Sequence, residues 1–438
     1  MGAQPRHIIH LDADAFFASV EQAADKRLRG RAMAVGGQRR GIIASASYEA
    51  RARGIVTAMP TSRALKLCPD LTVVPGHFDL YERFSDSIFG LCEDLTPWVE
   101  RASIDEGYLD LGGIQRGPLM PPDPVDLQRV DERGPRGAAV RGREQAVARA
   151  VRQLDTDIHG WLKITVSSGI AGNKLVAGVA SKLRKPHGFV AVPRGREAAF
   201  LAPLPVRRLP GIGPKATATL QGIGVQTIGQ LIALGPDGLR PFFQRETEGL
   251  LDKARGIDTT PLVTERADAR SYGQQETFDS DIGDFDQVDR IAKRMIDQLM
   301  PRLRKERVQA RTLTLRIRYT DMEEKTAAAS LSEPSDLEDD FYAQVRPLLH
   351  RAWLRRVHLR LVGVRFSQVY PVWEQPLLFD DPRDRRRNLV QAADRLNQVL
   401  GPGRTALRRA CHLLDGTPAA EAGITAGNCA GRCVPPAS

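Results

Sequence analysis

The chain has 438 residues, 42% of them hydrophobic, which is enough for about two to four domains with their own cores. Lysine and arginine outnumber aspartate and glutamate by 63 to 53, and this net charge of +10 favours a polyanionic partner. No run of about 18 apolar residues exists, which excludes a membrane-spanning helix. The five cysteines form no CxxC pair and no signal-peptide pattern is present, so we expect a cytoplasmic protein with reduced thiols.

The first part of the chain predicts strands and helices around two acidic segments. A buried strand over residues 7–15 contains Asp12, and a second strand over residues 101–111 contains Asp105 and Glu106. Between them the sequence predicts, in chain order, a helix from Phe16, short strands at 33–35 and 41–44, a helix after Pro60 and a helix over 80–95.

Carboxylates on otherwise apolar strands are costly to bury unless they are paired or bound to metal. If the two strands deliver Asp12, Asp105 and Glu106 to one point, they form a site for two Mg²⁺ ions, which prefer a few carboxylates together with substrate phosphates. Paired ions about 3.5–4 Å apart promote phosphoryl transfer. Each acidic segment alone is also consistent with a helix cap or a solvated turn.

Three other features fit a nucleotide. A Phe pair such as Phe16 and Phe17 usually packs in a core, but one ring against a sugar would select deoxyribose by clashing with a 2′-hydroxyl. Tyr48 and Arg51 lie one helical turn apart and suit a phosphate ligand, although such a pair alone is more often a surface salt-bridge turn. Lys185 stands before a proline and either reaches a triphosphate or complements a helix end.

The remainder of the chain begins with an irregular segment. Residues 114–145 are rich in proline, glycine and arginine without apolar periodicity, so we expect a mobile surface insertion. Beyond it the sequence predicts, in order, a helix over 144–160, a strand at 164–167, a helix capped by Asn173, an all-helical stretch over 203–256, a polar linker over 259–270, alternating strands and helices over 271–370, and one amphipathic tail helix closed by Gly401.

Two segments are candidates for DNA binding. Gly211, Gly213 and Lys215 lie between predicted helices in a helix-hairpin-helix pattern, whose backbone N–H groups bind phosphate without reading bases. Farther along, a strand alternates so that Arg316 and Arg318 face outward, which suits a phosphate backbone. A plain tight turn and an ordinary solvated strand face are the respective alternatives.

The polar tail contains a short apolar run, from Gln375 through Leu378 to Phe379. An exposed peptide of this kind fits docking into a pocket on a partner. The alternative is that it packs back onto its own domain.

Taken in order, these segments resemble the Y-family of translesion DNA polymerases, closest to its bacterial DinB type. The resemblance covers residues 7 to about 370 and rests on a set of short motifs: His10-Leu11-Asp12, Phe16 to Glu21, Ala44 to Arg51, Ser103 to Glu106, Asn173-Lys174, Lys185-Pro186, Pro210 to Gly213, Glu276 to Phe278 and Gly363 to Phe366.

The resemblance implies an α+β, multidomain, right-hand polymerase. Its parts would be a palm over 1–15 and 82–192 that includes the insertion at 114–145, small fingers over 16–81, a helix-hairpin-helix thumb over 193–258, a linker over 259–270, an α+β little finger over 271–370, and a tail over 371–438 with a clamp-binding-like motif.

The resemblance also implies residue roles. Asp12, Asp105 and Glu106 would be the catalytic carboxylates and metal ligands, with the Ala13 carbonyl as a further ligand, and Phe17 would be the steric gate. Nucleotide contacts would come from Phe16, Phe17, Ser45, Tyr48, Arg51 and Lys185; DNA contacts from Gly211, Gly213, Lys215, Arg316 and Arg318; and sliding-clamp contacts from Gln375, Leu378 and Phe379.

The predicted function is DNA-directed DNA synthesis past damaged template, at low fidelity, by two-metal nucleotidyl transfer. The expected partners are primer-template DNA, dNTPs, the sliding clamp and two Mg²⁺ ions, for which Mn²⁺ could substitute, and the expected state is a monomer. One alternative is a non-catalytic DNA- and clamp-binding scaffold of a mutagenic complex. The other is a palm-type nucleotide cyclase.

Overall fold

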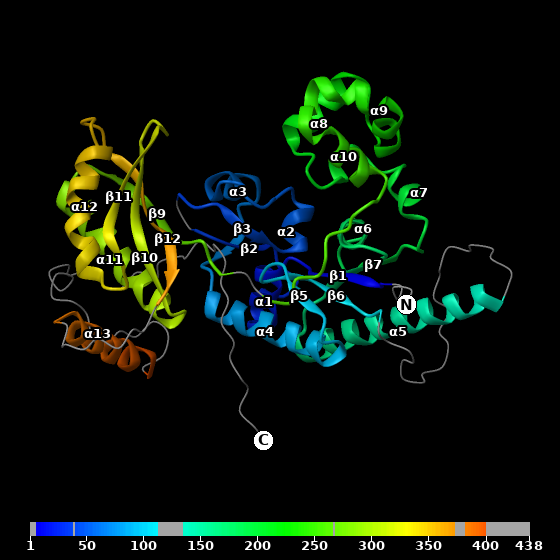
Figure 1. The fold of residues 1–438 in the computed structure, drawn as a ribbon, viewed down its shortest axis with the longest axis horizontal. Helices are drawn as coiled ribbons and strands as arrows, with labels where there is room; N and C mark the ends of the chain where they lie inside the picture. Colours follow the sequence, from blue (N-terminus) through cyan, green and yellow to red (C-terminus); the bar gives the residue numbers. More distant parts are fainter. Residues whose placement is uncertain (1–5, 38–39, 113–134, 266–267, 373–381, 400–438) are drawn as a thin grey trace. The chain divides into compact units, whose positions relative to one another are not determined.

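The computed structural model describes residues 6–37, 40–112, 135–265, 268–372 and 382–399 (Figure 1). The described residues divide into two compact units, one formed by residues 6–31, 80–112 and 135–265 and the other by residues 32–37, 40–79, 268–372 and 382–399. No helix among the described residues is both long and apolar enough to cross a lipid bilayer.

The first unit is organised by a five-stranded sheet with β1 (Ile8–Ala13) at its centre. All six residues of β1 are buried, because strands pair with both of its edges and helices cover both faces. The strand order is β5-β6-β1-β7-β8, with the bounds β5 (Val99–Arg101), β6 (Glu106–Asp110), β7 (Val166–Ala171) and β8 (Phe189–Ala191).

Two glycines of this sheet pack closely against neighbouring helices. Gly107 of β6 faces α4 (Phe78–Leu95), where a Cβ would approach the Phe89 ring to 2.5 Å and the Glu100 carbonyl to 2.8 Å, so a larger residue would displace these neighbours. Gly169 of β7 faces α6 (Lys174–Ser181), where a Cβ would approach the Ala177 carbonyl to 2.2 Å. Helix α1 (Phe16–Ala24) and the 3-10 turn Lys26–Leu28 follow β1 directly.

The expected loop over residues 114–145 is partly wrong. Residues 113–134 lie outside the described part of the chain, but α5 (Pro135–Leu162) is already helical through the last eleven residues of the predicted insertion. Pro135 at the first helical position is favourable because its missing N–H needs no partner there, and alanine-rich sequence follows it.

The expected continuous strand over residues 101–111 is also wrong. The strand is broken by a turn, so that Asp105 precedes β6 and Glu106 is its first residue. The Ser103 hydroxyl accepts hydrogen bonds from the N–H groups of Asp105 (3.2 Å) and Glu106 (3.0 Å). A serine that binds backbone amides in this way favours a turn over a strand ladder.

The stretch predicted as all-helical, residues 203–256, is mainly helical up to residue 254, and one further short helix precedes it. The helices are α7 (Glu197–Leu201), α8 (Pro214–Gly222), α9 (Ile228–Phe243) and α10 (Thr247–Ala254), with 3-10 turns at Val206–Arg208 and Gln244–Glu246. The hairpin before α8 contains Gly211 at φ +100°, a conformation that strongly favours glycine. Pro214 opens α8 at the N-terminal position that the sequence indicates.

The second unit contains two sheets. A three-stranded sheet of order β3-β2-β4 is formed by β2 (Met33–Gly36), β3 (Ile43–Ala46) and β4 (Thr72–Val74), with the helices α2 (Tyr48–Ala52) and α3 (Thr61–Leu67). A four-stranded antiparallel sheet of order β11-β10-β12-β9 is formed by β9 (Ser271–Ile282), β10 (Val308–Tyr319), β11 (Glu324–Ser335) and β12 (Leu359–Pro371).

Helices α11 (Phe285–Lys305) and α12 (Glu338–Ala352) pack on one face of the four-stranded sheet. The predicted alternation in β10 is confirmed, because Leu313, Leu315, Ile317 and Tyr319 are completely buried. The predicted tail helix is present as α13 (Pro382–Val399).

Helix α13 docks on this sheet domain through charges. The buried Arg304 of α11 donates to Asp394 of α13 at 2.7 and 3.1 Å and to Glu338 at 2.8 Å. On the same helix Leu389 is 74% exposed, so the apolar stripe that predicted the helix does not dock it.

Candidate active site

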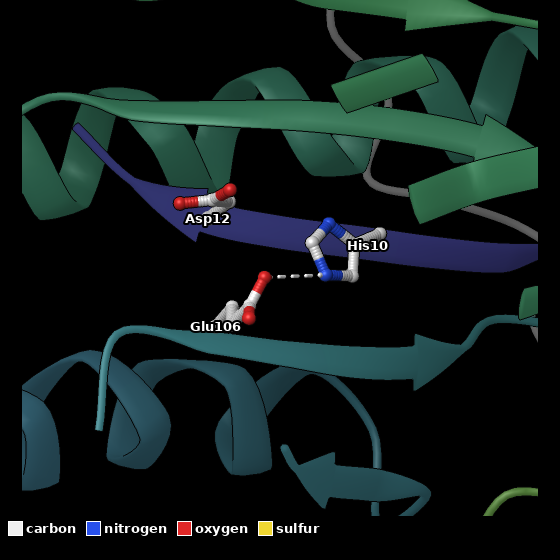
Figure 2. Close-up of side chains that lie close together, drawn as sticks. All are labelled: His10, Asp12 and Glu106. Atoms are coloured by element: carbon white, nitrogen blue, oxygen red, sulfur yellow. Dashed lines mark ion pairs between the residues drawn. The ribbon is translucent and has the colours of Figure 1, made fainter. Parts of the chain in front are cut away.

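Carboxylates of β1 and β6 meet at one end of the first sheet. Asp12 and Glu106 are directly paired residues in the antiparallel register, and His10 lies two residues before Asp12 on the same face of β1. Side-chain ligand atoms of His10, Asp12 and Glu106 all lie within 4.8 Å of one another (Figure 2). The structure therefore brings together two of the three predicted catalytic carboxylates.

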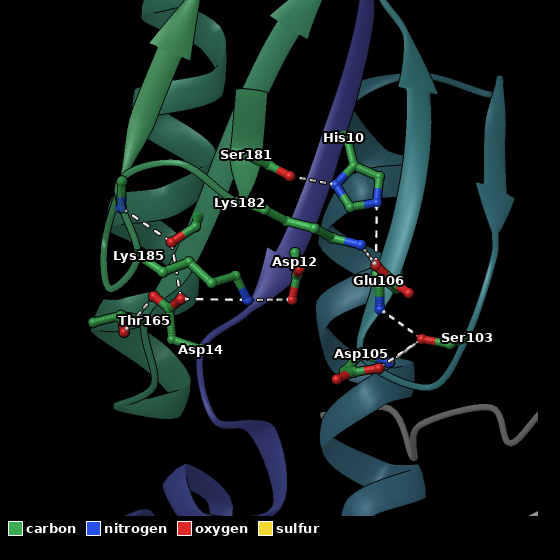
Figure 3. A network of polar contacts seen from close by, with 12 residues as sticks. His10, Asp12, Asp14, Ser103, Asp105, Glu106, Thr165, Ser181, Lys182 and Lys185 are labelled. Carbon is green, nitrogen blue, oxygen red and sulfur yellow. Dashed lines mark hydrogen bonds and ion pairs between the residues drawn. The ribbon is translucent and has the colours of Figure 1, made fainter. Parts of the chain in front are cut away.

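Asp105 lies beside this group but its carboxylate points to a different partner. The Ser103 hydroxyl donates to Asp105 Oδ1 at 2.6 Å, while the Asp105 backbone carbonyl accepts the Ala13 N–H at 2.9 Å (Figure 3). The backbone contact holds the β5–β6 turn against the end of β1.

Two lysine ammonium groups contact these carboxylates. Lys185 Nζ is 2.5 Å from Asp12 Oδ1 and 3.6 Å from Asp14 Oδ1, and Lys182 Nζ is 3.1 Å from Glu106 Oε2. Burial raises the pKa of Asp12, against the opposing effect of Lys185. The hydrogen bond with His10, assisted by Lys182, lowers the pKa of Glu106 to about 2. Four carboxylates, those of Asp12, Asp14, Asp105 and Glu106, therefore stand against two ammonium groups in this network, and carboxylate oxygens are the ligands that Mg²⁺ prefers.

Asp14 is fully buried and binds the loop that carries Lys185. Its carboxylate accepts hydrogen bonds from the Thr165 hydroxyl (3.0 Å), the Ser167 hydroxyl (2.8 Å) and the His187 N–H (2.7 Å). The carboxylate is therefore fully engaged in tying β1 to β7 and to the Lys185 loop (Figure 3).

Sequence reasoning missed several members of this network. His10 carries a recognisable signal, since it is a polar residue two positions before Asp12 in an apolar strand and so shares its face. Ser181 and Lys182 carry none that is specific, because their contacts join segments about 171 and 76 residues apart in the sequence.

Of the predicted nucleotide residues in this unit, Phe16 is buried and Phe17 is half-buried. The Phe17 ring stacks on Tyr81 with ring centres 4.5 Å apart, and Tyr81 donates to Glu21 at 2.5 Å. Tyr81 thus supports the Phe17 ring from α4, and the more exposed position of Phe17 suits a ring that meets a ligand.

Comparison with known proteins identifies the family. Models described as the impB/mucB/samB family, its C-terminal domain and the IMS family HHH motif match residues 11–182, 269–376 and 194–225. The DNA polymerase IV of Opitutus terrae is 48% identical over 392 residues, covering 89% of this chain and 94% of the relative. That of Desulfatibacillum aliphaticivorans is 35% identical over 402 residues, covering 90% and 94%. This chain belongs to the Y-family of translesion DNA polymerases.

A solved Y-family DNA polymerase chimera has the same fold, with a TM-score of 0.70 at 24% sequence identity, over 84% of this chain and all of that one. The predicted family, the α+β multidomain fold and the DNA-directed DNA polymerase class are confirmed. The palm, fingers, thumb and little-finger boundaries stay predictions.

The remaining nucleotide residues of this Y-family polymerase lie in the second unit. Ser45 is in β3, and Tyr48 and Arg51 are on α2 as predicted, with the Arg51 guanidinium 4.9 Å from the Tyr48 ring centre. Arg51 also donates to the Ala46 carbonyl at 2.9 Å. These contacts fix the two side chains side by side on one short helix.

The predicted DNA-binding arginines of this polymerase share one carboxylate. Arg316 and Arg318 extend from the face of β10 opposite the helices, and both bind Glu324, at 2.5 Å in each case. The first unit has a cavity of about 450 Å³ between α6 and the helical hairpin, lined by Lys174, Lys182, Arg207 and Arg208 and by one carboxylate, Asp258. The predicted clamp residues Gln375, Leu378 and Phe379 lie outside the described residues.

Proposed function

We propose that this Y-family polymerase extends a primer with dNTPs using two Mg²⁺ ions held by Asp12, Asp105, Glu106 and the Ala13 carbonyl. The observation that carries this assignment is the pairing of Asp12 with Glu106 at the end of β1, with an ammonium group on each carboxylate. The donor set fits Mg²⁺, since it offers carboxylate and carbonyl oxygens and a strong local negative charge. Mn²⁺ accepts the same ligands and is the expected substitute.

Bound divalent ions in such a site stabilise the attacking and leaving oxygens of in-line nucleotidyl transfer. The chain's own residues arrange this site. Asp12 and Glu106 are fixed by strand pairing, and Asp105, at the turn before β6, would complete the set of carboxylate ligands. Lys185, which contacts Asp12 here, would be free to bind the triphosphate if a cation took its place.

The other assignments follow from the resemblance of these segments to the motifs of the family. Phe17, backed by Tyr81, acts as the steric gate against a 2′-hydroxyl, and Phe16 beneath it shapes the nucleotide pocket. Ser45 lines that pocket, and Tyr48 and Arg51 bind the triphosphate together with Lys185. A rigid aromatic pair gives a gate that cannot rotate away at low cost.

The polymerase binds primer-template DNA through the DNA phosphates. Gly211 and Gly213 expose backbone N–H groups before α8, next to Lys215, while Arg316 and Arg318 form a cationic strip on β10. Both devices read charge and shape rather than base sequence, as a polymerase that moves along DNA requires. The four cations around the cavity in the first unit extend the positive surface next to Glu106.

We further propose that Gln375, Leu378 and Phe379 dock on the sliding clamp and that the enzyme is a cytoplasmic monomer. The support is the apolar run in a polar tail and the bacterial origin of the relatives, whose DNA lies in the cytoplasm. Co-purification with the clamp should be lost when all three residues become alanine, and light scattering should give the mass of one chain.

The test of the assigned function is primer extension with four dNTPs and Mg²⁺ by the wild type, Asp105→Asn and the control Asp94→Asn, which changes an exposed carboxylate of α4. We expect distributive extension by the wild type and the control, and none by Asp105→Asn. If the wild type binds primer-template but does not extend it, the scaffold alternative replaces the polymerase assignment.

A further inference from the structure

A buried hydrogen-bonded chain leads from α6 to Glu106. Ser181, at the end of α6, is 1% exposed and its hydroxyl lies 2.7 Å from His10 Nδ1. His10, also 1% exposed, faces Glu106 with its other ring nitrogen, Nε2, at 3.4 Å from Oε2 (Figures 2 and 3). The chain joins residues 171 positions apart in the sequence, and none of the roles assigned above uses it.

The partners of this chain place a proton on Nε2 of His10. A carboxylate only accepts hydrogen bonds, so His10 attracts Glu106 when Nε2 carries a proton. At the other side of the ring, the Ser181 hydroxyl lies 2.7 Å from Nδ1 and 3.1 Å from the Gly178 carbonyl. It can donate to a bare Nδ1, or accept from a protonated Nδ1 while it donates to Gly178. In either arrangement Ser181 holds the ring with Nε2 toward Glu106.

The ring of His10 is also fixed in orientation. It packs against Tyr108, the residue opposite it in β6, with ring centres 4.6 Å apart. Tyr108 is itself covered by the Lys174 ammonium, 4.9 Å from its ring centre. The ring consequently has little freedom to turn its Nε2 away from the carboxylate.

Holding Oε2 of Glu106 fixes the plane of the carboxylate and so the position of Oε1. His10 Nε2 and Lys182 Nζ both contact Oε2, at 3.4 and 3.1 Å. Groups that orient a metal ligand from behind typically change metal affinity or activity by about 10–100-fold when they are removed.

We propose that Ser181 and His10 are positioning residues that orient Glu106 for the metal ion. This inference rests on the proposed role of Glu106 as a ligand. It assigns no contact between either residue and the substrate, and it predicts that the effect of both residues passes through Glu106 alone.

The test measures Mn²⁺ binding by electron paramagnetic resonance, with the metal as the only ligand added. His10→Phe keeps the ring volume and removes the donor, and we expect about 10–100-fold weaker binding. His10→Gln places an amide N–H near the position of Nε2, so binding should recover to within about fivefold of the wild type. The Mn²⁺ affinity of Ser181→Ala should lie between those of His10→Phe and His10→Gln.

The matched control is Ser168→Ala, since Ser168 is a buried serine of β7 whose hydroxyl has no hydrogen-bond partner among the described residues. It should bind Mn²⁺ as the wild type does. Equal weakening by this control would show a general packing effect and overturn the inference. Glu106→Gln separates the two proposals. If Glu106→Gln binds Mn²⁺ as the wild type does, Glu106 is not a metal ligand. If Glu106→Gln binds Mn²⁺ more weakly but His10→Phe binds it normally, only the positioning role of Ser181 and His10 is refuted.

A second readout needs no metal and no disruptive variant. In metal-free protein labelled with ¹⁵N-histidine, His10 should show a protonated Nε2, and Ser181→Ala should shift the Nδ1 resonance. A neutral His10 with its proton on Nδ1 would overturn the proposal. This measurement tests whether His10 directs an N–H at Glu106 even if His10→Phe does not fold.

Discussion

Asp14→Asn tests whether the buried carboxylate of Asp14 holds the Lys185 loop. Three donors bind this carboxylate, from Thr165, Ser167 and the His187 backbone, and Lys185 Nζ lies 3.6 Å away. Asparagine has nearly the same shape but presents one oxygen and one amide nitrogen, without charge. At least one donor must then rotate or lose its acceptor, and all contacts lose their charge assistance.

Hydrogen bonds to charged groups stabilise by about 1.5–3 kcal/mol each, against about 0.5–1.5 kcal/mol for neutral ones. Three weakened bonds, partly offset by the lower desolvation cost of a neutral side chain, give a local loss of about 2–3 kcal/mol. That loss corresponds to about 30- to 150-fold faster hydrogen exchange of the Lys185 loop when exchange follows local opening.

The assay is hydrogen exchange with mass spectrometry on a peptide that covers residues 182–191, in metal-free protein. A peptide from α12 should exchange as in the wild type, and Asp94→Asn should change neither peptide. The reasoning is refuted if the 182–191 peptide of Asp14→Asn exchanges within about threefold of the wild-type rate, because the network would then contribute little to holding the loop.

Four more outcomes are expected. Glu324→Gln should raise primer-template affinity by about two- to fivefold in low salt, because it releases two arginines, and the gain should vanish in high salt; a fluorescence-anisotropy titration measures it. Phe17→Ala should increase ribonucleotide incorporation at least about tenfold in a single-nucleotide assay, and no change would remove Phe17 as the gate. Asp394→Asn should undock α13 and speed its proteolysis, since it removes a charged partner of the buried Arg304, whereas unchanged cleavage would show that other contacts hold the helix. Glu106→Gln should lower the melting temperature of the metal-free protein more at pH 6 than at pH 3.5. The pKa of Glu106 is lowered from its ordinary value of 4.5 to about 2 in the folded protein, so its ionised carboxylate stabilises the fold fully above pH 4.5. This stabilisation is lost as the pH falls toward about 2.

Local chemistry made much of the fold predictable. The buried apolar run of β1, the cap of Asn173 on α6 and the alternation of β10 each depend on a few neighbouring residues, and all three are present. The hairpin at Gly211 was predictable because its conformation requires glycine there.

The two errors in the predicted secondary structure have different local causes. Ser103 turns the chain before Glu106 by binding two backbone amides, although the surrounding residues read as a strand. Helix α5 starts nine residues before the predicted start at residue 144, because helix-forming residues outweigh Gly137 and Gly142.

The sequence predicted some long-range contacts of the site and not others. The convergence of Asp12 and Glu106 was predictable because each lies in or next to an apolar strand pattern. The burial of Asp14 by β7 and the contact of Ser181 with His10 depend on the register of β1 against its neighbours, which no local signal encodes. The docking of α13 through Asp394 was hidden for the same reason, since an apolar stripe predicts a different face.

We propose above that the carboxylates at the end of β1 hold the metal ions for nucleotidyl transfer. Rapid-quench incorporation of one correct dNTP by the wild type and Asp12→Asn, across a Mg²⁺ titration and with primer-template affinity measured alongside, tests this role. We predict at least about a 100-fold lower maximal rate for Asp12→Asn with DNA affinity within about twofold of the wild type. An unchanged rate at saturating Mg²⁺ would contradict the account.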